Sequence, residues 1–407
     1  MRGLTLKRFL FFCFSAIIFI SCQKANQQRD ISHLSWDEIV AAAKGTTVNL
    51  IMWQGDPYIN AYMNNFVVPE LKKNYAIDLK IANGQGSQIV QILMTEIEAK
   101  KQTSEIDLMW INGETFYQLR QIKALYGPFT DRLPNAEYID FENPFIKYDF
   151  QQEVNGYECP WGNVQLAIIY DSTRVPSPPK TMQELEAYVK KHPGKFTIGS
   201  DFTGMTILKS FLIALAGGAA ELRGAFDQKK YAFYSAQLWD YLNRLKPYFW
   251  KAGKTFPAAV APMHQMFANG ELDFTISNND GEVDNKVVLG FFPPTARAYV
   301  FDSGTIQNSH YMGIPNHSGN KAGAMAVCDF LISPEAQLQK MNPEVWGDGT
   351  ILALDKLPEE WREKFQHIPT RKYAPKREEI QSKALPELAP EYMIRLYEDF
   401  RRNVIEK

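Results

Sequence analysis

Apolar strands and helices alternate over the first third of the chain, and this alternation restricts the fold more than any other feature. Thr47–Trp53 is apolar and bounded by glycine, as a buried strand is. The pattern continues with a helix over Tyr58–Asn74, a strand over Ile77–Ile81, a helix over Ser87–Lys100 and a strand over Ile106–Ile111. Strands joined through helices pair in parallel, so the sequence predicts an α/β domain.

A second series of strands and helices surrounds a proline-rich break at residues 176–181. It predicts strands over Val164–Tyr170, Phe196–Gly199, Leu272–Ser277 and Val287–Phe291, and helices over Met182–Lys191, Thr206–Ala216, Tyr231–Tyr248 and Pro262–Asn269. One long helix is expected over Lys321–Met341. We therefore expect an α/β protein with a first lobe built from residues 35–170 and 287–345, a second lobe of residues 171–286, and a helical C-terminal tail of residues 346–407.

The first 21 residues are typical of a secretory signal peptide. Arg2, Lys7 and Arg8 precede an uncharged apolar run of 12 residues, which is too short to cross a bilayer. The run ends at Phe19-Ile20-Ser21-Cys22, so we expect cleavage before Cys22 and lipidation of its thiol. Residues 22–34 are predicted to be a lipid-anchored tether. An ordinary signal peptide with an incidental cysteine is the alternative.

Composition indicates an exported globular protein with no affinity for nucleic acid. The 407 residues are 45% hydrophobic and 22% charged, with 44 basic and 46 acidic residues. Loss of the three basic residues of the signal peptide leaves 41 basic against 46 acidic residues, a net charge of −5. Cys159 and Cys328 are the cysteines beyond the lipidation site, and they either pair in an oxidising compartment or remain as buried thiols.

Motifs of catalysis, metal binding and cofactor binding are absent, so we predict neither an enzyme nor a cofactor nor a metal site. The sequence lacks the G-x-S-x-G, H-E-x-x-H, P-loop and C-x-x-C patterns. Residues 83–86 (NGQG) lack the third glycine of a dinucleotide-binding turn. The acidic run Asp280–Asp284 departs from the EF-hand spacing and favours a solvated turn.

Tryptophan, glycine and polar residues recur where predicted strands end, which is where ligands bind in open parallel sheets. An indole face stacks on a ring or holds a cation, and Asp56 or Glu114 would neutralise that cation. The predicted ligand-binding residues are Trp53, Gln54, Asp56, Trp110, Asn112, Glu114, Trp161, Asn163, Ser200, Asp201, Thr203, Asn278, Asn279 and Asp280.

Two alternatives to a cationic site remain at this stage. Glycine, asparagine and aspartate are also the default residues of turns, and a single tryptophan more often packs than binds. An anionic solute is the other alternative, because residues 200–204 begin a predicted helix whose amides would accept a phosphate or carboxylate.

The chain resembles the bacterial extracellular solute-binding lipoproteins of ABC importers. The likeness rests on the lipobox cysteine, on Val48–Trp53, on Ile106–Trp110, on Pro160-Trp161-Gly162, on Pro179–Leu185 and on Ile314-Pro315 with the helix Phe330–Gln337. Within this family it is most similar to the YnjB-type branch, which resembles binding proteins for thiamine, polyamines and ferric iron. Phe291-Phe292 stands where the iron binders carry paired tyrosines, which argues against iron.

The resemblance implies a type II periplasmic-binding-protein fold, with a ligand cleft between two lobes and two hinge crossings near Ala167–Tyr170 and Val287–Phe292. The lobes would close on a small solute and present it to ABC permease and ATPase subunits. The protein would then reside in the periplasm or on the outer cell surface, held to the membrane by its lipid. The alternatives are a secreted two-lobed hydrolytic lipoprotein acting on carbohydrate, with Asp56 and Glu114 as its acid/base pair, and a purely structural envelope lipoprotein.

Overall fold

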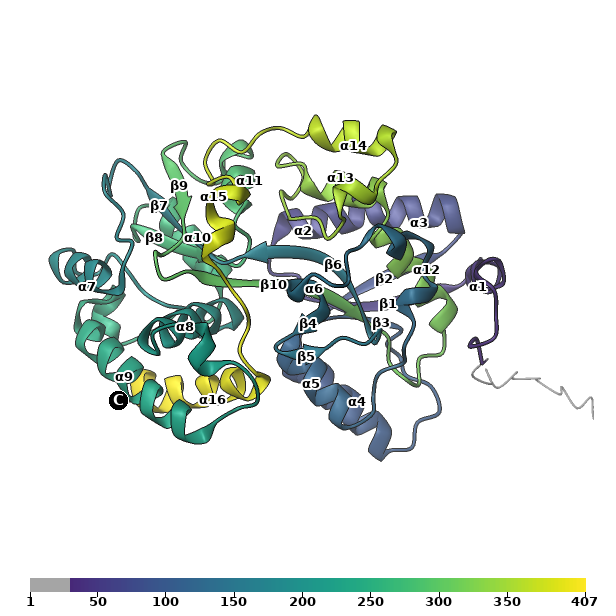
Figure 1. The fold of residues 1–407 in the computed structure, drawn as a ribbon, viewed down its shortest axis with the longest axis horizontal. Helices are drawn as coiled ribbons and strands as arrows, with labels where there is room; N and C mark the ends of the chain where they lie inside the picture. The colour runs from purple at the N-terminus through teal and green to yellow at the C-terminus, as the bar shows by residue number, and fades with distance from the viewer. Residues whose placement is uncertain (1–29) are drawn as a thin grey trace, which may run out of the picture.

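The structure, a computed structural model, describes residues 30–407, so the predicted signal peptide, Cys22 and most of the tether lie outside the described residues. Two lobes lie side by side, and the long strands β6 (Glu158–Gln165) and β10 (Thr305–Gly313) run from one toward the other (Figure 1). This two-lobed α/β arrangement agrees with the fold predicted from the sequence.

The first lobe is built on a mixed sheet with the strand order β11-β10-β3-β1-β2, in which β6 pairs with β10. As the strand–helix alternation predicted, β1 pairs in parallel with β2 and β3, whereas β10 runs antiparallel to β3 and β6. The bounds of the first three strands are β1 Thr47–Met52, β2 Asp78–Asn83 and β3 Leu108–Ile111.

Helices cover both faces of this sheet. Helix α1 (Trp36–Ala43) opens with the capping box of Ser35 and Glu38. The connections between strands hold α2 (Pro57–Tyr62), α3 (Val68–Tyr75), α4 (Gly86–Glu98) and α5 (Gly113–Gln121). Short elements then precede β6, namely α6 (Pro144–Lys147), β4 (Tyr148–Asp149) and β5 (Gln152–Glu153).

The second lobe surrounds a three-stranded antiparallel sheet with the order β8-β7-β9. Its strands are β7 (Ala167–Asp171), β8 (Phe274–Ser277) and β9 (Ala296–Tyr299). Its helices are α7 (Met182–Lys191), α8 (Phe202–Leu215), α9 (Gln228–Leu245), α10 (Val260–Ala268) and α11 (Glu282–Val288).

Four elements differ from the sequence prediction. Val164–Tyr170 is not one strand, because it spans the end of β6, the connecting Leu166 and most of β7. Val287–Phe291 is not a strand, because α11 occupies residues up to Val288. Phe196–Gly199 is buried but has no strand partner. The helix expected over Lys321–Met341 is two helices, α12 (Lys321–Leu331) and α13 (Pro334–Met341), because Ser333 caps a new helix and a proline follows it.

The chain passes between the two sheets at two points. The first is Leu166, between β6 and β7, next to the crossing expected at Ala167–Tyr170. The second is the segment 300–304, between β9 and β10, rather than Val287–Phe292. Since only these short segments join the paired strands of the two sheets, they are where a hinge motion would bend the backbone.

The C-terminal tail contacts both lobes. It holds α14 (Glu359–Gln366), α15 (Arg377–Ile380), the short strand β11 (Ala384–Leu385) and α16 (Pro390–Phe400). Figure 1 shows it, in yellow, passing from α14 beside the first lobe to α15 beside the second, and then across to α16 beneath α8. Helix α16 packs against α8 of the second lobe and α5 of the first.

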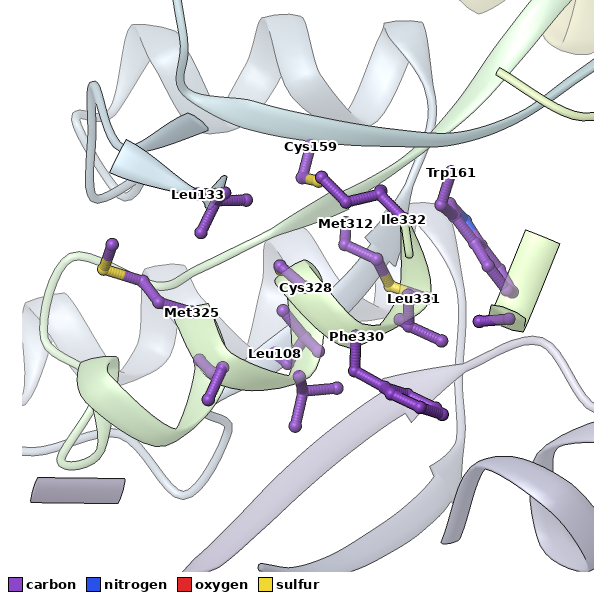
Figure 2. Close-up of a cluster of buried hydrophobic side chains, with 14 of the residues drawn as sticks. Leu108, Leu133, Cys159, Trp161, Met312, Met325, Cys328, Phe330, Leu331 and Ile332 are labelled. Carbon is purple, nitrogen blue, oxygen red and sulfur yellow. The ribbon is translucent and has the colours of Figure 1, made fainter. Parts of the chain in front are cut away.

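Both remaining cysteines lie in the core of the first lobe. Cys159 on β6 and Cys328 on α12 are fully buried free thiols within a cluster that includes Leu108, Met312 and Met325 (Figure 2). Burial, followed by the neighbouring Cys328, raises the pKa of the Cys159 thiol well above its ordinary value. Among residues 30–407, no helix has the length and apolar character needed to cross a membrane.

Candidate functional site

The end of β1 carries the first of the predicted ligand-binding residues. The ring of Trp53 lies against the backbone of Gly55, where an added Cβ would be 2.4 Å from it. The backbone N–H of Gln54 donates to Asn83 Oδ1 over 3.1 Å, which ties the ends of β1 and β2 together. Trp53 and Gln54 are both partly exposed, so they remain available to a solute.

Asp56 is committed to contacts within the protein. Its Oδ1 accepts the backbone N–H groups of Tyr58 and Ile59 at the start of α2, at 2.7 and 3.2 Å. Its Oδ2 forms an ion pair with Lys286 of α11 in the other lobe. The ammonium group of Lys286 also lies 4.3 Å from the centre of the Tyr58 ring. Asp56 and the Tyr58 ring of the first lobe therefore bind the ammonium group of Lys286 from the second lobe, and not that of a solute.

The three tryptophans do not share one exposed cleft. Trp161 was expected to face the solute, but its side chain is 0% exposed within the core of the first lobe. Its ring lies 4.9 Å from that of Trp110, nearly perpendicular to it, and 5.4 Å from that of Trp346 (Figure 2 shows Trp161). Trp110 is partly exposed, so it remains a candidate for solute contact and Trp161 supports it from behind.

The end of β3 presents acceptor groups that lack donors. Asn112 precedes α5 without capping it, and its Oδ1 is buried with no hydrogen-bond partner. Oε2 of Glu114, in the first turn of α5, is also buried and unpartnered. Burial raises the pKa of Glu114 to about 7. Glu114 therefore exchanges its proton near neutral pH and, unlike Asp56, has an oxygen to spare.

In the second lobe, the start of α8 already holds a carboxylate. Asp201 Oδ1 accepts the N–H of Gly204 over 3.0 Å, and its Oδ2 accepts the N–H of Val260 over 2.7 Å. The Ser200 hydroxyl donates to the carbonyl of Pro257 over 3.3 Å. A side-chain carboxylate therefore takes the place that an anionic solute would need, which weakens the anionic alternative.

The end of β8 is held by the C-terminal tail. Asn278 Nδ2 donates to Thr203 Oγ1 over 3.0 Å and leaves its own Oδ1 unpartnered. Asn279 Nδ2 donates to the carbonyl of Gly347 over 3.4 Å. Asp280 is 1% exposed and pairs with two guanidinium groups of the tail, those of Arg371 and Arg377. Asp280 is therefore a tie between the tail and the second lobe.

Asn163 lies on β6 and borders a cavity beside the crossing strands. Its amide oxygen accepts Gln307 Nε2 over 2.7 Å, and its nitrogen donates to Ser309 Oγ over 2.9 Å. The cavity measures ≈ 210 Å³ and is lined by Asn163, Gln165, Asp280, Gln307, Arg377, Ile380 and Gln381. A larger cavity of ≈ 300 Å³, between α7 and α9, contains none of the predicted site residues.

Sequence reasoning missed several charged residues around these strand ends. They are Lys209, Lys286, Asp149, Glu158, Arg371, Arg377 and Glu387. Lys209 gave one usable signal, because it is the only charged residue in the otherwise apolar helix Phe202–Leu215. The others resemble ordinary surface residues in the sequence, and their partners lie far away along the chain.

Comparison with known proteins assigns the family. Residues 66–366 match the family described as bacterial extracellular solute-binding protein. The chain belongs to this family. It is also 38% identical over 335 residues to protein YnjB of Escherichia coli strain K12, an alignment that covers 81% of this chain and 86% of YnjB. The family match makes the protein a solute-binding protein, as the sequence resemblance implied.

Solved structures share the fold at low sequence identity. A putative spermidine/putrescine ABC transporter protein from Listeria monocytogenes aligns with a TM-score of 0.63 at 18% identity, covering 89% of this chain and 99% of its own. The periplasmic binding protein AfuA from Actinobacillus pleuropneumoniae, with bound fructose-6-phosphate, aligns with a TM-score of 0.61 at 14% identity, covering 88% and 98%. Both support the two-lobed periplasmic-binding-protein fold. These relatives are described as transport or binding proteins and not as enzymes.

Proposed function

We propose that this solute-binding protein captures a small cationic amine by closing its two lobes and delivers it to the permease and ATPase of an ABC importer. The observation that carries the cationic class is a set of unpartnered acceptors at the strand ends and in α2, the helix that follows β1. Asn60 Oδ1, Asn112 Oδ1, Glu114 Oε2 and Asn278 Oδ1 are all buried acceptor oxygens without a donor. Each such group costs about 1–3 kcal/mol when left unpaired, and a solute rich in N–H donors would remove that cost.

Two further observations support a cation over an anion. Asp201 already occupies the start of α8, where an anion would otherwise bind. The partly exposed rings of Trp53 and Trp110 offer π faces, and a cation over an indole gains about 0.5–2 kcal/mol. The titles of structural relatives name both spermidine/putrescine and a sugar phosphate, so fold alone does not select the solute. The acceptor surplus is the observation that supports a cationic solute.

The ion pair of Asp56 with Lys286 suggests how closure is stabilised. It joins α2 of the first lobe to α11 of the second, and both side chains are at least nine-tenths buried. Opening the lobes at the two crossings would separate this pair and expose the strand ends to solvent. A captured amine would add contacts to the same closed arrangement.

Calorimetric titration and small-angle scattering test this proposal. We expect 1,4-diaminobutane, spermidine or thiamine to bind and to reduce the radius of gyration, whereas glucose and fructose-6-phosphate should do neither. Glu114→Gln should weaken amine binding about tenfold or more, because it removes the free carboxylate. Glu98→Gln, an exposed glutamate on α4, is the matched control and should bind normally. Tight binding of the sugar phosphate with no response to amines would refute the cationic class.

The hydrolytic alternative finds little support in the site. Its acid/base pair would be Asp56 and Glu114, and both oxygens of Asp56 are engaged by the start of α2 and by Lys286. A carboxylate held in this way is poorly placed to take a proton from water. Absence of sugar release from polysaccharides, together with amine binding, would separate the two functions.

We also propose that the protein is exported and held at the membrane by lipid on Cys22. Cys22→Ser should move the mature protein from the membrane fraction to the soluble fraction of the cell envelope, because one residue carries the whole anchor. Ser21→Thr is a suitable control that leaves the thiol in place. A Cys22→Ser protein that stays with the membrane would contradict the lipid anchor.

A further inference from the structure

Five buried carboxylate oxygens on three elements of the first lobe have no hydrogen bond of good geometry, although the backbone N–H of Gly113 still stabilises the charge of Asp149. They are Glu114 Oε2 on α5, both oxygens of Asp149 on β4, and both oxygens of Glu158 on β6. Asp149 is 1% exposed and Glu158 is 0% exposed. A buried carboxylate that lacks both a donor and a cation is costly, so such groups either hold a proton or wait for a cation. We call these three residues the acid cluster.

Packing brings the acid cluster against a cation of the second lobe. The ring of Phe150, next to Asp149, lies directly on the start of α5, where a Cβ on Gly113 would be 1.8 Å from it. The ammonium group of Lys209 lies over the same ring, 3.9 Å from its centre. Lys209 is 0% exposed and forms an ion pair with Glu387 of the tail. One ammonium group therefore faces carboxyl groups from the first lobe and from the tail.

The protonation of the acid cluster follows from its burial. Burial raises the pKa of Glu114 to about 7. Burial, and next the negative charges of Glu387 and Glu114, raise the pKa of Asp149 well above its ordinary value. Burial and the charge of Asp149 do the same for Glu158. The cluster therefore carries exchangeable protons at neutral pH.

We propose that solute capture releases protons, because the ammonium group of the solute binds at the partly exposed Glu114 and its charge takes the place of protons that the electrostatically linked acid cluster otherwise holds. This inference rests on the proposed function, since it requires a cationic solute. The exchange is balanced, because a carboxylic acid loses its proton to solvent and the resulting carboxylate accepts a hydrogen bond from an N–H group of the ammonium ion. No covalent bond of the solute forms or breaks. A lower pH would therefore weaken capture of the solute and promote its release.

Groups on several elements packed around the cluster contribute to its titration, and Tyr311 on β10 lies in the electrostatic field of Asp149 and Glu158. Arg120 on α5 acts on Glu158 with a positive charge, and Lys209 on α8 acts on Glu114 and Asp149 in the same sense. The negative charge of Glu387 in the tail acts in the opposite sense and raises the pKa values of Glu114 and Asp149. The hydroxyl of Tyr397 on α16 lies in the field of Glu114 and of Asp201. Within residues 30–407 no group of three or more acidic, histidine or cysteine side chains is arranged to hold a metal ion.

Calorimetric titration with 1,4-diaminobutane, in phosphate and in Tris at pH 7, measures the protons released. We expect between about 0.5 and 1 proton per amine bound, and an affinity about tenfold lower at pH 6 than at pH 8 for a group titrating near 7. Glu114→Gln should abolish most of this pH dependence. Asp149→Asn, as a second variant, should lower the proton count while leaving the diamine bound. Glu98→Gln should release as many protons as the wild type.

The outcomes separate this inference from the function on which it rests. Diamine binding whose heat is the same in both buffers would overturn proton release and leave the cationic function intact. Absence of binding by any amine would overturn the cationic function and proton release together. Thermal unfolding of each variant shows whether it is folded. If Glu114→Gln is unfolded, the proton count of Asp149→Asn provides the test instead.

Discussion

Asp280→Asn is expected to lower the free energy of unfolding by about 3 kcal/mol. Removing one partner of a buried ion pair leaves the other charge uncompensated, which costs about 3–5 kcal/mol. The side chains of Arg371 and Arg377 are 22% and 35% exposed, so water compensates part of the loss and the lower end of that range applies. Asparagine still accepts the backbone N–H of Gln165, which isolates the contribution of the charge.

Urea unfolding at several pH values checks this prediction. Against the effect of burial, Arg377 and Arg371 hold the pKa of Asp280 well below its ordinary value. The stabilisation is therefore present above about pH 4, where an unfolded aspartate is ionised, and is lost as the pH falls further. The difference between wild type and Asp280→Asn should shrink accordingly below pH 4.

A matched surface pair provides the control for Asp280→Asn. Asp302 also pairs with a residue of the tail, Lys383, at 2.6 Å, but its side chain is 52% exposed. Asp302→Asn should change stability by less than about 1 kcal/mol, as exposed ion pairs do. Equal effects of the two substitutions would mean that the tail is not held through Asp280.

This expectation treats the tail as part of the fold, a role that the sequence did not indicate. The sequence predicted a helical tail, and α14, α15 and α16 agree with that. It did not predict that the tail ties down the end of β8 and places α16 between α5 and α8. Those contacts join residues that are 68 positions apart or more, such as Asn279 with Gly347 and Arg371 with Asp280, and no local pattern encodes them.

Local patterns predicted the elements well where capping and periodicity agreed. Met182–Lys191 was predicted with the bounds that α7 has, because Thr181 caps it and apolar residues repeat at helical spacing. The strand predicted over Val287–Phe291 was wrong, because a short apolar run is compatible with a strand and with the end of a helix. The prediction of one helix over Lys321–Met341 was wrong because it did not take account of Ser333-Pro334, a pair that ends one helix and begins the next.

The positions of the predicted site residues at strand ends could be read from the sequence, but their partners could not. Strand ends do carry Trp53, Asn112 and Glu114, since chain order alone puts the ends of parallel strands at one edge. The partner of Asp56 is Lys286, 230 residues away, and only the folded chain brings them together. The acid cluster was not predictable for the same reason, because contacts such as the packing of Phe150 on Gly113 join segments that are far apart in the sequence.

Trp161→Ala is expected to lower the free energy of unfolding by about 3–5 kcal/mol, as removal of a buried aromatic ring does. The ring is 0% exposed among Trp110, His310 and Trp346. Trp161→Phe should cost less, because its indole N–H is buried without an acceptor and phenylalanine removes that unsatisfied donor. Urea unfolding followed by far-ultraviolet circular dichroism measures both losses.

Amine affinity distinguishes packing from solute contact at the two neighbouring tryptophans. Trp161→Phe should leave the dissociation constant for 1,4-diaminobutane within about twofold of the wild type, since no solute reaches a fully buried ring. Trp110→Ala removes a partly exposed ring and should weaken binding by about 2-fold to 30-fold, which corresponds to about 0.5–2 kcal/mol for a cation over an indole. The opposite ranking, with Trp161→Phe abolishing binding at unchanged stability, would mean that the cleft opens as far as the Trp161 ring. The pairing of Trp161 with Lys340, which donates to the Trp161 carbonyl at 2.5 Å within a fully buried network, argues that this core stays closed.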